Sequence, residues 1–167
     1  MKTIVEVEAI FHCSLERAFK TPILGDATQF LTGYGPVPAV VKFTDDSTWG
    51  QPGGRRIPQS AQNWVSKGGA VGVDEIYARE ENKYWKWGVA EFRQWSMGFT
   101  EFQGELFFEE ISDNAVKVRW VYTLYSNSLL AYPFHWFFGN VFWKGQMRGA
   151  IREMKRYAES GEGFAYE

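Results

Sequence analysis

The feature that most constrains the fold is a helical segment of about 28 residues near the end of the chain, from Pro133 to Ser160. Proline is compatible with the first turn of a helix, and Gly161 is a natural stop. The C-terminal half of the segment is amphipathic, because apolar residues recur every three or four positions and charged residues fill most of the others. We therefore expect one stripe to be buried. The stripe consists of Met147, Ala150, Ile151, Met154, Tyr157 and Ala158.

The first half of this helix, from Phe134 to Trp143, is apolar nearly all the way round and needs a partner on its outer side. Four partners are open at the level of sequence: the loop from Ser60 to Gly69, a second copy in a homodimer, a membrane surface, or a ligand at a pocket mouth. The apolar stretch from Leu129 to Trp143 is shorter than the roughly 20 residues that cross a bilayer. We expect no transmembrane segment.

The chain before the helix alternates apolar and polar residues in the manner of β-strands. A strand from Thr3 to Cys13 is followed by two short helices, Leu15 to Thr21 and Asp26 to Thr32, and Pro22 should interrupt the first of them. Further strands are predicted at Val40–Thr44, Arg55–Ile57, Ala70–Ala78, Lys83–Phe92, Phe99–Ile111 and Ala115–Ser126, the last four as two hairpins. We expect an α+β fold and one domain spanning residues 1–167.

The composition reduces the number of partner classes that we expect for this chain. Eighteen Lys and Arg face 20 Asp and Glu without a long run of like charge, so nucleic acid is not an expected partner. Cys13 is the only cysteine, and His12 and His135 have no second ligand at metal-binding spacing, so we expect neither a metal nor a cofactor. Met1 to Glu8 lacks the pattern of a signal peptide, and together with the single cysteine this favours a cytoplasmic protein.

The first hairpin carries the candidate catalytic residues, Glu75 and Glu91. With the turn centred on Glu81, the facing pairs are Tyr77–Trp85, Glu75–Trp87, Val73–Val89 and Val71–Glu91. A carboxylate among such rings could act as a general acid or base, or anchor a ligand hydroxyl. In the competing interpretation Glu75 pairs with Arg55 or Arg56, or the register is one residue different and this face turns to solvent.

The second hairpin supplies the expected interior of the sheet. Phe102, Gly104, Leu106 and Phe108 share one face with Val116, Val118, Trp120, Tyr122 and Leu124 of the facing strand. Aromatic residues make up 18% of the chain, so a wide core or pocket must be lined by rings. The candidate ligand-binding residues are Glu75, Tyr77, Trp85, Trp87, Phe102, Leu106, Trp120, Tyr122, Trp143 and Met147. Without further information a filled core and a ligand cavity both remain open.

Three stretches carry a resemblance to a known superfamily. They are FHCSLERAF at residues 11–19, GGRRI at 53–57 with VDEI at 73–76, and VRWVYTLYS at 118–126. In their order they resemble the START and Bet v 1-like (SRPBCC) superfamily, particularly its polyketide cyclase/dehydrase-like members, over essentially the whole chain. The resemblance implies a helix-grip fold, in which a curved antiparallel sheet wraps around the C-terminal helix, and a cavity between them.

Members of that superfamily bind lipids, sterols, hormones or polyketides, and a minority are enzymes. The resemblance thus favours binding of a small hydrophobic molecule, with Glu75, Tyr77 or Tyr122 as its polar contacts. A cyclase, aromatase or hydrolase using Glu75 or Glu91 is the first alternative. A module that docks on a partner or a membrane through Phe134 to Trp143 is the second.

Overall fold

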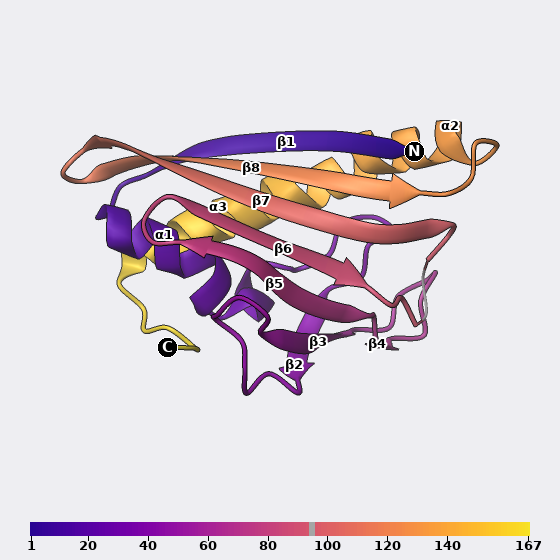
Figure 1. Cartoon of the computed structure of the whole chain (residues 1–167), viewed down its shortest axis with the longest axis horizontal. Coiled ribbons are helices and arrows are strands. Elements are labelled where there is room, and N and C mark those ends of the chain that lie inside the picture. The colour runs from indigo at the N-terminus through magenta and orange to yellow at the C-terminus, as the bar shows by residue number, and fades with distance from the viewer. Residues whose placement is uncertain (94–95) are drawn as a thin grey trace.

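The computed structural model describes residues 1–93 and 96–167, and its centre is an antiparallel sheet (Figure 1). The strands are β1 (Lys2–Phe11), β2 (Val40–Thr44), β3 (Arg55–Ser60), β4 (Gly69–Ala70), β5 (Val73–Glu80), β6 (Tyr84–Ala90), β7 (Phe99–Ser112) and β8 (Ala115–Ser126). Their order across the sheet is β1-β8-β7-β6-β5-β3-β2, and β4 pairs with β3.

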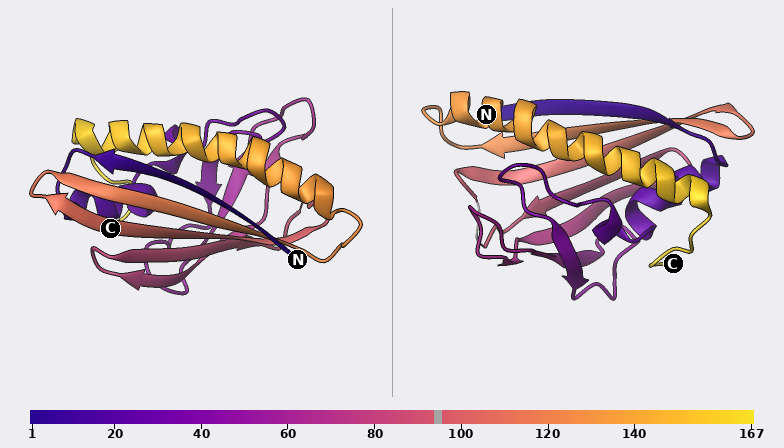
Figure 2. Two further views of the ribbon diagram at one scale, coloured as in Figure 1. Left: turned by 90° about the horizontal axis from the view of Figure 1, so that it is seen from above. Right: turned by 180° about the vertical axis from the view of Figure 1, so that it is seen from behind.

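Helices cover one face of this sheet. They are α1 (Leu15–Leu24), the 3₁₀ turn η1 (Ala27–Gln29), α2 (Tyr132–Phe138), the π-helical turn η2 (Gly139–Trp143) and α3 (Lys144–Ser160). The last three run end to end across the sheet, with α2 beside the N-terminus and the end of α3 beside α1 (Figure 2). The predicted helix-grip fold is confirmed.

The C-terminal helix is built as its sequence pattern indicates. All six residues of the predicted stripe are buried, and Gly161 ends the helix in the left-handed conformation (φ 75°) that glycine adopts without strain. The one departure is the π turn η2, where the single expected helix takes one wider turn. None of the described helices is both long and apolar enough to cross a bilayer.

The strand β1 and the hairpin of β7 and β8 have the predicted faces. Val5 lies opposite Tyr122 and Val7 opposite Trp120, and all four side chains are buried. Apolar residues therefore fill one face from the free edge of β1 across three strands, and the helix α3 packs on that face.

The two short helices differ from their predicted bounds. Pro22 lies inside α1, which continues to Leu24 because Pro22 and the two residues after it are buried in the core. The second helix is only the turn η1, closed by the Asp26 carboxylate, which accepts a hydrogen bond from the Thr28 amide (3.1 Å). The helix α1 still packs against α3, β7 and β8, and η1 packs against α1 and β2.

The predicted register of the first hairpin is wrong. A β-bulge lies between Ile76 and Ala78, so Ile76 pairs with Trp87 and Glu75 pairs with Gly88. The bulge at Tyr77 exchanges the two faces of β5 beyond it, because one extra residue reverses the alternation. Asp74 and Ile76 consequently point into the interior, whereas Glu75 and Tyr77 point outward.

Candidate functional site

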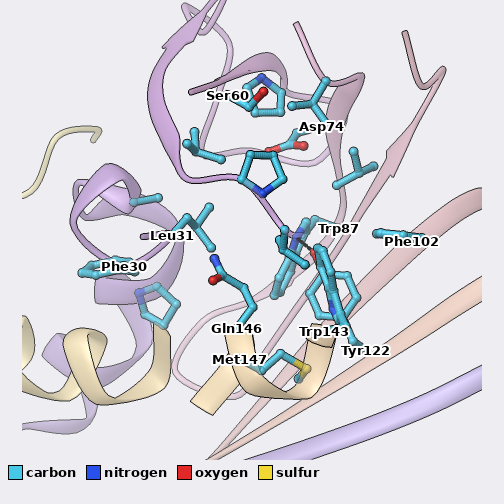
Figure 3. A pocket seen from close by; sticks show the side chains of 18 of the residues that line it. Phe30, Leu31, Ser60, Asp74, Trp87, Phe102, Tyr122, Trp143, Gln146 and Met147 are labelled. Carbon is cyan, nitrogen blue, oxygen red and sulfur yellow. Dashed lines mark hydrogen bonds between the residues drawn. The ribbon is translucent and has the colours of Figure 1, made fainter. Parts of the chain in front are cut away.

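A cavity of about 120 Å³ lies between the sheet and the start of α3 (Figure 3). Its sheet wall is formed by Trp87 and Val89 of β6, Phe102 of β7, and Trp120 and Tyr122 of β8. Its helix wall is formed by Trp143, Gln146, Met147 and Met154, and its third side by residues around η1 and β2, among them Phe30, Leu31, Val37 and Val40. Most of the lining is therefore apolar or aromatic.

The aromatic wall is fixed by contacts among its own rings. Trp87 donates a hydrogen bond from Nε1 to the Tyr122 hydroxyl (3.2 Å), and the Tyr122 ring packs edge-to-face on Trp143, with centroids 5.1 Å apart. Gly104 makes room for Trp87, because a Cβ atom there would lie 2.3 Å from Cζ2 of the indole. The wall is thus a rigid surface on which a flat ligand can pack.

A buried ion pair forms the charged part of the lining. Arg56 of β3 donates from Nε to Oδ2 of Asp74 on β5 (3.2 Å), and both side chains are more than 90% buried. The guanidinium lies between two rings, with Cζ 3.7 Å from the centroids of Phe43 and Trp49. This stacking holds the Arg56 fork in one orientation.

Several polar atoms of the cavity residues have no hydrogen-bond partner within the described part of the chain. They are Nη1 of Arg56, Oδ1 of Asp74, and the indole Nε1 atoms of Trp120 and Trp143. A buried polar atom without a partner costs about 1–3 kcal/mol, so such groups normally meet water or a ligand. The side-chain amide of Gln146 also points into the cavity in Figure 3.

Burial also shifts the acidities of two cavity groups. It raises the pKa of the Asp74 carboxyl, and the neighbouring Arg56 cation only partly opposes this shift. Burial likewise raises the pKa of the Tyr122 phenol, which stays protonated at neutral pH. A carboxyl with a raised pKa inside a cavity can hold or exchange a proton.

The structure brings six of the predicted ligand-binding residues together around the cavity. These are Trp87, Phe102, Trp120, Tyr122, Trp143 and Met147. Trp85 and Leu106 are buried beside the cavity and do not line it: Trp85 stacks on Phe19 (4.8 Å between centroids) and donates from Nε1 to the Phe19 carbonyl (2.9 Å).

The predicted inward orientation of Glu75, Glu91 and Tyr77 is wrong. Glu75 and Glu91 lie outside and pair with Arg55, at 3.4 Å and 2.8 Å. Tyr77 donates a hydrogen bond from its hydroxyl to Oε1 of Glu101 on the same outer face (2.7 Å). The competing interpretation, in which Glu75 pairs with Arg55 and the register is shifted, agrees with the structure.

The charged residues that line the cavity, Arg56 and Asp74, were not predicted from the sequence. A usable signal was present, because Arg55–Arg56 and Asp74–Glu75 are adjacent charged pairs within predicted strands. Neighbouring strand residues point to opposite faces, so one member of each pair had to face the interior.

The fold and the cavity together define a class. The chain has the Bet v 1-like fold, with a curved sheet, a long C-terminal helix and an internal cavity between them. No family model matches the sequence, and no curated protein matches it by sequence.

Particular solved structures resemble it along nearly their whole length. Ara h 8.0201 is 13% identical, with a TM-score of 0.64 over 96% of this chain and 100% of the other. The protein TTHA0849 from Thermus thermophilus is 11% identical, with a TM-score of 0.70 over 96% and 99%. Norcoclaurine synthase from Thalictrum flavum, in complex with dopamine and hydroxybenzaldehyde, is 6% identical, with a TM-score of 0.67 over 98% and 90%. At these identities the likeness shows the fold alone.

Proposed function

We propose that the protein binds a small, uncharged and mainly apolar molecule, about one aromatic ring in size, in the cavity between the sheet and α3. The observation that carries this proposal is the set of partnerless polar atoms on residues of an otherwise aromatic cavity, within the part of the chain that is described. Pockets for small molecules have this composition, a largely apolar lining with a few oriented polar groups.

The size of the ligand follows from the cavity. At about 120 Å³ the cavity is smaller than the roughly 300–1,000 Å³ of pockets for drug-sized ligands and close to the roughly 150 Å³ of a cavity that holds benzene. A single ring with a small substituent fits, whereas a sterol or a long acyl chain needs the walls to move apart.

The polarity of the ligand follows from the ion pair. Arg56 offers a donor at Nη1 and Asp74 an acceptor at Oδ1, and the pair is electrically neutral when both groups are charged. A hydroxyl or amide can satisfy one or both atoms, whereas an ionised carboxylate would add a second negative charge beside Asp74 in a low-dielectric site. The complex of a similarly folded protein with dopamine and hydroxybenzaldehyde agrees with a phenol-like ligand.

The test is calorimetric titration with three probes: phenol, toluene and benzoate. We expect phenol to bind at least about fivefold more tightly than toluene, since a buried hydrogen bond contributes about 0.5–1.5 kcal/mol and the phenol hydroxyl can form two of them, one with Arg56 and one with Asp74. Benzoate should bind more weakly than phenol because its charge is not compensated.

A double variant isolates the polar pair. Arg56→Met with Asp74→Val should fold, because a buried ion pair can often be replaced by apolar residues without loss of stability. It should bind toluene and lose the preference for phenol. The matched control is Arg55→Met with Glu75→Val, the outward-facing pair one residue away on the same strands, which should keep that preference. Failure of the wild type to bind any of the three probes, or an unchanged preference in the cavity variant, contradicts the proposal.

A second candidate function is proton transfer by Asp74 on the bound molecule. The raised pKa of its carboxyl and the free Oδ1 atom favour it. Under this alternative, a molecule that co-purifies with the protein should be turned over, and Asp74→Asn should abolish turnover while binding persists. A co-purified molecule that is recovered unchanged after incubation contradicts the alternative.

A further inference from the structure

Exposed apolar side chains gather at one end of the molecule, around α2. We call this group of side chains the aromatic face. Its side chains are between 40% (Val141) and 96% (Leu130) exposed. The face consists of Leu129, Leu130, Phe134, Trp136, Phe137 and Val141. It occupies the solvent side of α2 and the loop before it, at the end of the molecule that carries the N-terminus (Figures 1 and 2). Exposed apolar side chains that gather on neighbouring positions of the chain are typical of a contact site.

Nothing in the described chain covers the aromatic face. The loop from Ser60 to Gly69, one of the covers that the sequence left open, packs elsewhere: Asn63 donates to the Pro36 carbonyl (3.1 Å), and Trp64 is itself 79% exposed. The half of the helix that does pack inward includes His135 and Phe138, which are buried. The described residues therefore leave this face free for an external partner.

The chain segment that carries the face has no acidic residue. No Asp or Glu occurs between Asp113 and Glu153, a stretch that contains the whole aromatic face. Lys144, Arg148 and Arg152 follow Val141 at three- and four-residue spacing on α3, which places them along one side of the helix.

These three cations are not neutralised by the protein. None of them forms an ion pair in the part of the chain that the structure describes. They line a shallow groove beside β1, in which the facing carboxylates, Glu6 and Glu8, are already paired with Arg119 and Lys117 on β8. An anionic partner is therefore the one that fits.

We propose that the aromatic face docks the protein on an anionic lipid surface, with Lys144, Arg148 and Arg152 against the headgroups. Trp and Phe side chains on one side of a short helix, followed by cations, suit the boundary between acyl chains and headgroups. A second copy fits less well, because pairing two such faces would bring together acid-free segments with no carboxylate to meet the cations.

This docking is separate from ligand binding in the cavity. The turn η2 connects the two sites, since it carries Val141 on the aromatic face and Trp143 in the cavity wall. The helix wall of the cavity would then lie next to the lipid.

The test is co-sedimentation of the full chain with vesicles of phosphatidylcholine alone or mixed with phosphatidylserine. The wild type should bind the mixed vesicles more strongly, and added salt should weaken that binding. Trp136→Ser with Phe137→Ser should lower binding at least tenfold. The matched control is Ile111→Ser, at the tip of the β7–β8 hairpin at the opposite end of the molecule (Figure 1), which should bind as the wild type does.

A second pair of variants tests the cations. Arg148→Gln with Arg152→Gln should lower binding to mixed vesicles about tenfold or more, since each cation near an anionic surface contributes about fivefold. The matched control is Lys42→Gln on β2 with Lys86→Gln on β6. It removes the same number of positive charges and should change binding to mixed vesicles little. All variants alter surface side chains, and circular dichroism and calorimetry with phenol check that fold and cavity are intact.

Two outcomes overturn the proposal. One is equal sedimentation of the wild type and the aromatic-face variant on every vesicle. The other is a native mass spectrum in which the wild type is a dimer and Trp136→Ser with Phe137→Ser is a monomer, since a second copy would then cover the face.

Discussion

Replacing Gly104 by alanine tests how tightly the aromatic wall is packed. Gly104 of β7 pairs with Trp87 of β6, and a methyl group on it would lie 2.3 Å from the indole, far inside the roughly 3.5 Å of a normal carbon contact. Overpacking of this kind costs about 1–3 kcal/mol. The indole can escape only by shifting, which strains its hydrogen bond to the Tyr122 hydroxyl and moves one wall of the cavity.

Urea unfolding of Gly104→Ala should therefore show a loss of about 1–3 kcal/mol, and calorimetry should show weaker binding of phenol. The matched control is Gly149→Ala in α3, where an added Cβ meets no atom within 4 Å. There the same change should stabilise the protein by about 1 kcal/mol, because alanine is the better helix former. If Gly104→Ala is as stable as the wild type and binds phenol equally well, the described packing of Trp87 is wrong.

Three further predictions concern single side chains. Burial raises the pKa of Asp74, so this group's contribution to stability is present below the ordinary aspartate pKa of about 4 and is lost as pH rises through the folded-state pKa. In urea titrations, the free energy of unfolding of Asp74→Asn should therefore rise relative to that of the wild type as pH rises through that window. A difference that does not change with pH would contradict the burial of Asp74. Trp85→Phe leaves the Phe19 carbonyl without its donor and should cost about 1–3 kcal/mol in the same assay; no measurable cost would refute the buried hydrogen bond. Glu75→Gln should change stability by less than about 1 kcal/mol and leave phenol affinity unchanged, because Glu75 is partly exposed on the outer face; a clear loss of affinity would restore it as a cavity residue.

The parts of the fold that the sequence predicted well have long, uninterrupted patterns. The two strands of the second hairpin alternate over more than ten residues each, and the stripe on α3 repeats over three turns. In both cases one error of register would expose many apolar side chains, so the pattern admits a single solution. Trp120, Tyr122 and Met147 could thus be assigned to the interior from sequence.

The first hairpin could not be assigned in the same way. The bulge at Tyr77 lies in a run of ordinary strand residues without a glycine or proline to mark it, and it reverses which side chains face inward. The prediction consequently selected Glu75 in place of Asp74. The π turn at η2 was also not predicted, and within it Trp143 packs against Phe102 and Tyr122.

A crystal structure of the protein soaked with phenol would show whether the cavity holds a small ring with its polar group at the Arg56–Asp74 pair. We expect the phenol ring to lie against Trp87 and Trp143, with its hydroxyl within hydrogen-bond distance of Asp74 Oδ1 or Arg56 Nη1. A cavity that holds only water, or a ring bound away from the ion pair, would contradict it.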